Sequence, residues 1–333
     1  MDKIISTTAQ VKENNKELIK KAIIELKQAT KIMVAKKTGL SVATCNTLLN
    51  ELARSEEIVE VKLEKKASCA GRPSKTFRIN DDFHLTCCIS FLKDATGFSI
   101  HYEIIDLLGN ILSEKMLSEA EITYEKIYHL LQSIILEYSN LRIISISIPG
   151  MKDEDNKIVT CSIPSLIGIN LVQSIEDDFG IPAMIDNDMN LIALGLYKEK
   201  KNLSSTTVIS LSFENGKCTG AGIIINGSII HGKNNHAGDT TILNLPVESP
   251  RGLFHSIPKI NMEDSIAKVI SIFIYLFNPD IIMLTGQSMN ITLIGPVSDL
   301  CKRSVGEARM PEIVYAQDTS SYLFTGLTEV TLS

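Results

Sequence analysis

The chain has 333 residues, of which 44% are hydrophobic and 22% charged, and its formal net charge is −6. This length predicts two or three domains, and the composition is typical of soluble globular proteins. The most apolar run, VISIFIYLF at 269–277, is too short to span a bilayer, and the first residues lack the apolar segment of a signal peptide, so we expect a cytoplasmic protein without a membrane partner.

Seven cysteines are scattered along the chain without a CxxC pair or a Cys/His cluster. This pattern is typical of reduced thiols and predicts neither disulfides nor a zinc site. The spacing of His231, His236 and His255 fits no metal-ligand template. We therefore expect no metal and no cofactor.

Charge is distributed unevenly. Residues 1–80 hold 16 Lys and Arg against 9 Asp and Glu, whereas the rest of the chain holds 17 against 30. A small basic segment joined to a larger acidic body indicates a nucleic-acid-binding module attached to a second domain. Lysine-rich helices that serve solubility alone are the alternative.

The basic segment begins with two predicted helices. KELIKKAIIELK at 16–27 places its apolar residues on one helical face. A second, short helix is expected over 31–38, followed by Gly39, whose backbone freedom suits the position after a helix.

A third helix is predicted over 42–53, with Ser41 as its N-cap. Its opposite face carries small or hydrogen-bonding side chains, as a helix that enters a DNA major groove requires. The residues expected to face the core are Val42, Cys45, Leu48, Leu49 and Leu52.

The next segment predicts two strands, 58–63 and 74–79, around a basic loop. Gly71-Arg72-Pro73 is extended and rigid, so Arg72 could enter a narrow minor groove, although a solvated interdomain loop is the alternative. Together these elements predict a winged helix-turn-helix over residues 1–80. Its expected DNA contacts are Ser41, Ala43, Thr44, Asn46, Thr47, Asn50, Lys65, Lys66, Arg72 and Lys75.

From residue 83 onwards, predicted strands alternate with helices. Three strands, a helix over 124–138 and a buried strand at 143–149 come first. The same order recurs later, with a hairpin turn at Asn226-Gly227, a helix at about 263–277 and a strand at 280–286.

Two halves with one order predict an α/β fold of two lobes around a cleft, as in the actin-like (ribonuclease H-like) ATPases. We expect the first lobe over 81–190 and the second over 191–333, with the C-terminal helix packing back on the first lobe.

Several stretches, in a shared order, resemble the ROK family (repressors, open reading frames and sugar kinases), and in particular its repressor branch. TGLSVATCNTLLNEL is similar to the family's recognition-helix stretch, and AGRPSKTFRIN to its wing and linker. FGIPAMIDNDMNLIALG resembles the sugar-site segment, NHAGD the AGE segment, and NPDIIMLTG the nucleotide-proximal strand.

The resemblance implies a sugar site. In the family's kinases the Asp of the Asn-Asp pair accepts the proton of the attacking sugar hydroxyl, and Asp188 matches that position, with Asn187 expected to bond a neighbouring hydroxyl. Asp239 stands where the family has a longer, sugar-binding Glu, and Ser165 and Asn170 lie in the loop that closes over the sugar in relatives. A purely structural cap of the following helix is the alternative for Asp188.

The chain departs from the kinases at its phosphate loops. SFLKDATG lacks the glycines of the first loop, and SFENGKCTGAG carries Glu214, which would repel a phosphate. The family's zinc motif is missing, and only about 40 residues separate Asp239 from Pro279, so we expect a shortened second lobe. Because phosphoryl transfer depends on cradling phosphates, Asp188 is expected to bind and not to catalyse, and the protein is not expected to be an enzyme.

These observations together predict a DNA-binding transcriptional regulator, a repressor of carbohydrate genes with a sugar or sugar phosphate as effector. A homodimer or homotetramer would match a double-stranded, roughly palindromic operator. Two alternatives stay open at this point: an ATP-dependent sugar kinase, and a regulator that has lost its sugar site and responds to a protein partner.

Overall fold

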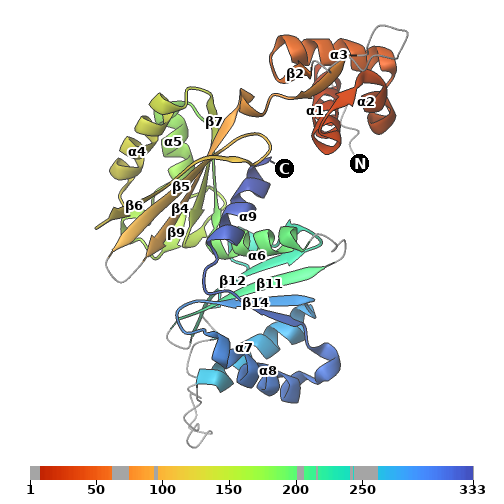
Figure 1. Cartoon of the computed structure of the whole chain (residues 1–333). Coiled ribbons are helices and arrows are strands. Elements are labelled where there is room, and N and C mark those ends of the chain that lie inside the picture. Colours follow the sequence, from red (N-terminus) through yellow and green to blue (C-terminus); the bar gives the residue numbers. More distant parts are fainter. Residues whose placement is uncertain are drawn as a thin grey trace, which may run out of the picture. The chain divides into compact units, whose positions relative to one another are not determined.

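The structure is a computed structural model that describes residues 8–61, 75–93, 97–200, 206–214, 217–240, 243 and 262–332. The chain forms two compact units (Figure 1). The first comprises Met1–Leu85 with Asp106–Asn110, and the second Thr86–Ile105 with Ile111–Ser333.

The first unit packs three helices against a small antiparallel sheet of order β1-β3-β2. Its elements are α1 (Thr8–Leu26), β1 (Ala29–Thr30), α2 (Lys31–Thr38), α3 (Val42–Arg54), β2 (Ile58–Val61) and β3 (Thr76–Ile79). The buried core comes from all three helices and the sheet, and includes Ile19, Ile23, Leu48, Leu49, Leu52 and Phe77.

Local capping explains where two of these helices begin and end. The Thr30 hydroxyl accepts a hydrogen bond from the Met33 amide at the start of α2, and Gly39 ends that helix in the left-handed region with φ 74°. The Ser41 hydroxyl accepts from the Thr44 amide and starts α3 at the predicted residue. The core stripe of α3 is as predicted except for Val42, which is 45% exposed because the first turn extends past the packed core.

The second unit contains two five-stranded sheets, which define its two lobes. The first-lobe sheet has the order β10-β7-β4-β5-β6 and the second-lobe sheet the order β13-β12-β11-β14-β15. In each sheet an antiparallel hairpin continues into parallel strands. The predicted α/β fold is therefore confirmed.

The first-lobe elements are β4 (Leu85–Lys93), β5 (Phe98–Ile105), β6 (Ile111–Glu119), α4 (Tyr124–Glu137), β7 (Leu141–Ile148), β8 (Gly150–Lys152), β9 (Ile158–Cys161), α5 (Leu171–Phe179) and β10 (Ala183–Asn187). The second-lobe elements are β11 (Thr207–Glu214), β12 (Lys217–Ile225), β13 (Ser228–Ile229), α7 (Met262–Phe277), β14 (Ile281–Thr285), α8 (Ile291–Val305) and β15 (Glu312–Tyr315). Two further helices, α6 (Asp188–Glu199) and α9 (Ser320–Leu332), lie between the sheets (Figure 1).

Helix α7 contains the most apolar run of the chain, and one of its faces is buried while the other is exposed. Ile266, Ile270 and Ile274 pack into the second-lobe core, whereas Leu276 is exposed. Within the described part of the chain, no helix has the length and apolar content that a membrane crossing requires.

Helices α6 and α9 pack so closely that backbone meets backbone. A Cβ at Gly195 would lie 1.9 Å from the Tyr322 carbonyl oxygen, and a Cβ at Gly326 would lie 2.1 Å from the Leu191 carbonyl oxygen. Every residue of α6 from Met189 to Leu196 is buried. Glycine is therefore required at both crossing points, and α6 is held in place from both sides.

Gly195→Ala should lower the free energy of unfolding by about 1–3 kcal/mol, the usual cost of overpacking a core. Gly295→Ala is the matched control, because Gly295 lies within α8 and an added Cβ would have no neighbour within 4 Å. The control should gain up to about 1 kcal/mol from helix propensity. Urea denaturation of the two variants measures the contrast, and equal effects would contradict the proposed backbone contact.

Candidate functional site

A cleft of about 460 Å³ opens between the two lobes at the start of α6. It is polar on both walls because strand ends and loops from both sheets meet there. Its lining includes Gly150, Cys161, Asn187, Asp188, Ser212, Glu214, Gly220, Asn235 and Asp239.

Asn187 fixes the junction between β10 and α6. Its Oδ1 accepts hydrogen bonds from the amides of Met189 (2.9 Å) and Asn190 (3.2 Å) and so caps the helix. Its Nδ2 donates to the Gly150 carbonyl oxygen at 2.7 Å. The side chain predicted to bond a sugar hydroxyl is thus engaged with backbone groups on both sides.

Asp188 is the first residue of α6 and faces the cleft, half-buried. Its Oδ1 accepts a hydrogen bond from the Met189 amide at 2.8 Å. Burial raises the pKa of Asp188 from 3.8 to about 7, the nearby Glu214 carboxylate adds to the rise, and the Met189 hydrogen bond opposes it. Near neutral pH this carboxyl therefore exists in both protonation states.

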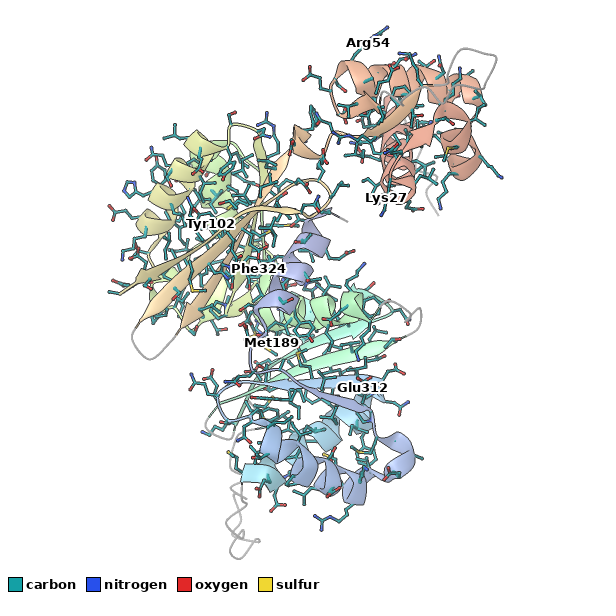
Figure 2. The ribbon with its side chains drawn as sticks, viewed as in Figure 1. Lys27, Arg54, Tyr102, Met189, Glu312 and Phe324 are labelled. Carbon is teal, nitrogen blue, oxygen red and sulfur yellow. The ribbon has the colours of Figure 1, made fainter. Side chains whose placement is uncertain are left out.

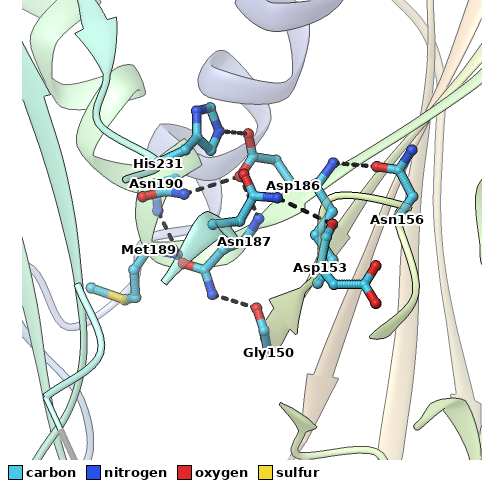
Figure 3. Close-up of polar contacts among 10 residues, drawn as sticks. Gly150, Asp153, Asn156, Asp186, Asn187, Met189, Asn190 and His231 are labelled. Atoms are coloured by element: carbon cyan, nitrogen blue, oxygen red, sulfur yellow. Dashed lines mark hydrogen bonds and ion pairs between the residues drawn. The ribbon is translucent and has the colours of Figure 1, made fainter. Parts of the chain in front are cut away.

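Asp186, two residues before Asp188, links the two lobes (Figure 3). Its carboxylate lies 2.9 Å from His231 Nε2 in the second lobe and accepts from Asn190 Nδ2 at 3.0 Å. Although burial acts to raise it, the pKa of Asp186 is lowered by the hydrogen bond and charge of His231 and by its amide partners. Asp186 in turn raises the pKa of His231 through the same hydrogen bond.

A second bridge crosses the cleft beside the first. Asn235, in the short 3₁₀ turn Lys233–Asn235 of the second lobe, donates to the Asp153 carbonyl oxygen at 3.1 Å (Figure 3). Neither bridge was predicted from the sequence. The only signal was that Asp186 lies two residues before Asp188, at the end of the predicted strand.

Asp239 also lines the cleft, on the second-lobe wall. Its loop runs so close to β12 that a Cβ at Gly238 would lie 1.9 Å from the Ala221 carbonyl oxygen, and Gly238 has φ 87°. Of the five predicted sugar contacts, the structure therefore brings together Asn187, Asp188 and Asp239.

The other two predicted sugar contacts, Ser165 and Asn170, do not belong to the cleft lining. The Ser165 hydroxyl donates to the Ile122 carbonyl oxygen. Asn170 caps α5 by accepting from the Gln173 amide at 3.0 Å, and it donates to the Asp155 carbonyl oxygen at 2.6 Å. Both side chains stabilise the loop that carries them.

The predicted DNA-contacting face of α3 is exposed along Ala43, Asn46, Thr47 and Asn50. Two threonine hydroxyls bond locally, Thr44 to Ser41 (2.8 Å) and Thr47 to the Ala43 carbonyl oxygen (3.2 Å). The side-chain amides of Asn46 and Asn50 form no hydrogen bond with the described residues, so they are available to a ligand.

Lys75 is exposed and pairs with Glu60 at 2.5 Å. Lys65, Lys66 and Arg72, the other basic residues predicted to contact DNA, lie outside the described residues.

Comparison with known proteins relates part of the chain to one family. The ROK family profile matches residues 94–250, which include the α6 junction and Asp239. Over these residues the chain is similar to the ROK family. A xylose repressor of Bacillus subtilis (strain 168) is 23% identical over 250 residues, which cover 72% of this chain and 63% of the repressor. The chain thus spans less than two thirds of that repressor's length.

Two solved ROK structures share the fold. A ROK family transcriptional regulator, a homologue of the E. coli MLC protein, aligns with a TM-score of 0.64 at 17% identity over 97% of this chain and 99% of its own. A ROK hexokinase from Thermus thermophilus aligns with a TM-score of 0.56 at 15% identity over 74% of this chain and 99% of its own. At these identities the similarity establishes the ROK fold and leaves the function to be argued.

Asp188→Asn should raise the free energy of unfolding at pH 8 by about 2 kcal/mol, since each unit of pKa shift corresponds to about 1.4 kcal/mol and partial solvent access reduces the total. The folded chain holds this carboxyl protonated up to about pH 7, whereas the unfolded chain ionises it near 3.8. Ionisation of Asp188 therefore opposes folding increasingly as the pH rises from about 4 to 7, and no further above it.

The gain from Asp188→Asn should consequently be smaller at pH 5 than at pH 8 in urea denaturation. Asp299→Asn, on an exposed position of α8, is the control and should change stability little at either pH. A gain that is the same at both pH values would show that the Asp188 carboxyl is not destabilised by burial.

Proposed function

We propose that this protein is a DNA-binding transcriptional regulator, a repressor whose effector is a sugar or sugar phosphate bound in the cleft. The observation that carries the proposal is the extent of the structural similarity. The regulator aligns over 97% of the chain, including the first unit, whereas the hexokinase aligns over 74%. The first unit is what a DNA-binding regulator has in addition to the two lobes.

The first unit supports a winged helix-turn-helix assignment. Helices α2 and α3 are joined by a tight turn at Gly39, and α3 leads into the antiparallel pair β2–β3, in which Val61 faces Thr76. The segment between these two strands is basic, as a wing that contacts phosphates requires. In this assignment α3 is the recognition helix and its free Asn46 and Asn50 amides contact base edges.

Ligand binding without phosphoryl transfer is proposed for the cleft. Asp188 has a pKa near 7, which would suit a general base, but the Glu214 carboxylate lines the same cleft and repels a phosphoryl donor. A bound sugar would alter the cleft that the Asp186–His231 and Asp153–Asn235 bridges span. Regulation then requires that the sugar has different affinities for the bridged and unbridged arrangements.

Asn46→Ala with Asn50→Ala should weaken specific DNA binding by about tenfold to a hundredfold, because a good side-chain pair with a base contributes about 1–3 kcal/mol. Both residues are exposed, so stability should stay within about 0.5 kcal/mol of the parent protein. The probe is a duplex selected from randomised DNA by the full-length protein, and the measurement is fluorescence anisotropy.

Asn14→Ala, an exposed asparagine on α1, is the matched control. Unchanged affinity in the α3 double variant, or failure of the full-length protein to enrich any duplex, would reject the DNA-binding assignment.

Asp188→Asn should weaken sugar binding by about tenfold or more, because a hydrogen bond to a charged acceptor contributes about 1.5–3 kcal/mol. Calorimetry with a sugar panel that begins with xylose, the sugar named for the Bacillus subtilis relative, measures this. Binding to the parent protein should also strengthen from pH 6 to pH 8, because the carboxylate form of Asp188 is the stronger acceptor.

Asp299→Asn again serves as the control, because this residue lies outside the cleft lining. Sugar binding that is insensitive to Asp188→Asn would remove Asp188 from the site. ATP-dependent phosphorylation of the bound sugar would identify a kinase instead.

A further inference from the structure

Three side chains that the cleft does not use meet on one face of the first-lobe sheet. His101 and Glu103 alternate along β5 and so point to the same face, and Glu114 on β6 lies directly opposite Glu103 in the antiparallel register. One imidazole nitrogen and one oxygen of each carboxylate all lie within 4.8 Å of one another.

Two of the three residues are buried, and the group is incompletely paired. His101 is 5% exposed and Glu103 is 7% exposed. His101 Nε2 lies 2.9 Å from a Glu114 carboxylate oxygen, while its Nδ1 has no hydrogen-bond partner. Among the described residues, the Glu103 carboxylate forms no hydrogen bond and no ion pair. A buried carboxylate without a partner is costly, and the described residues place no positive group beside Glu103.

We propose that His101, Glu103 and Glu114 form a binding site for a divalent transition-metal ion. An imidazole with two carboxylates is a mixed nitrogen and oxygen donor set, which suits Zn²⁺ and neighbouring ions. One dication balances the charge of two carboxylates.

The observed spacing already suits a metal. Two ligands at about 2.1 Å from a tetrahedral metal lie roughly 3.4 Å apart, so the His101 nitrogen and the Glu114 oxygen, now 2.9 Å apart, need to separate by only about half an ångström. Glu114 is exposed, which gives an ion a route from solvent, while Glu103 closes the buried side.

The surroundings hold the imidazole in place. Phe324 reaches from α9 towards this sheet, and its ring centroid lies 4.4 Å from that of His101 (Figure 2). A fixed ring orientation favours metal binding because the ligand does not have to be ordered when the ion arrives.

The alternative for the same residues is a His101–Glu114 ion pair beside a protonated Glu103. The two possibilities differ in stoichiometry. The metal site predicts one Zn²⁺ equivalent that depends on all three residues, whereas the ion pair predicts no dependence of Zn²⁺ binding on any of them.

The test is calorimetric titration of the full-length, tag-free protein with Zn²⁺ after treatment with EDTA. Glu103→Gln, Glu114→Gln and His101→Gln should each weaken one binding equivalent by at least about tenfold, since changes in residues that merely support metal ligands already cost that much. The matched controls are Glu125→Gln and His129→Gln, on exposed positions of α4, and both should bind as the parent does.

A second readout separates loss of the site from loss of the fold. In EDTA at pH 8, Glu103→Gln should melt no lower than the parent, because the change removes a buried charge. Zn²⁺ should raise the melting temperature of the parent and not that of Glu103→Gln, and Co²⁺ should give visible absorption bands only with an intact site. Zn²⁺ binding that is absent, or unchanged in all three ligand variants, would overturn the proposal.

Discussion

Helices α6 and α9 approach until backbone touches backbone at Gly195 and Gly326, and the rest of the second unit depends on this contact. Because the two helices fill the space between the sheets, each sheet buries its inner face against them. The N-terminus of α6 is thereby fixed at one point between the lobes. The cleft lies there, lined by Asn187 and Asp188 at the start of α6.

Each polar residue at the start of α6 has a different partner. Asn187 ties the helix start to the first lobe through Gly150, and Asp186 ties it to the second lobe through His231. Asp188 directs its carboxyl towards the cleft. Burial disfavours the charged form of this carboxyl and so raises its pKa. A site that accepts such a cost is typical of a binding surface and not of a core built for stability.

Features with a local cause could be predicted from the sequence. The end of α2 and the start of α3 followed from Gly39 and Ser41, whose capping acts within one turn. The two-residue strand β1 escaped prediction because it exists only by pairing with β3, far along the chain. The early start of α1 at Thr8 was also missed, since the first turns of this helix are mostly polar and the apolar periodicity begins only at Leu18.

The candidate site was predictable in part for the same reason. The positions of Asp188 and Asp239 in the cleft were predicted correctly because both residues belong to short stretches that resemble sugar-site segments of the family. The bridges of Asp186 to His231 and of Asn235 to Asp153 join residues 45 and 82 positions apart, so only the folded chain shows them. Ser165 and Asn170 were assigned by their loop, but their side chains bond the backbone of other segments, at Ile122 and Asp155.

The junction IDNDMN also limits how this protein can diverge. Changing Asn187 would remove the cap of the helix start, and changing Asp186 would remove one of the two bridges between the lobes, so each change has a cost to the fold. On the opposite wall Glu214 is exposed and forms no hydrogen bond with the described residues of α6. Lineages that acquire a new ligand preference would therefore change the second-lobe wall while the junction remains the same.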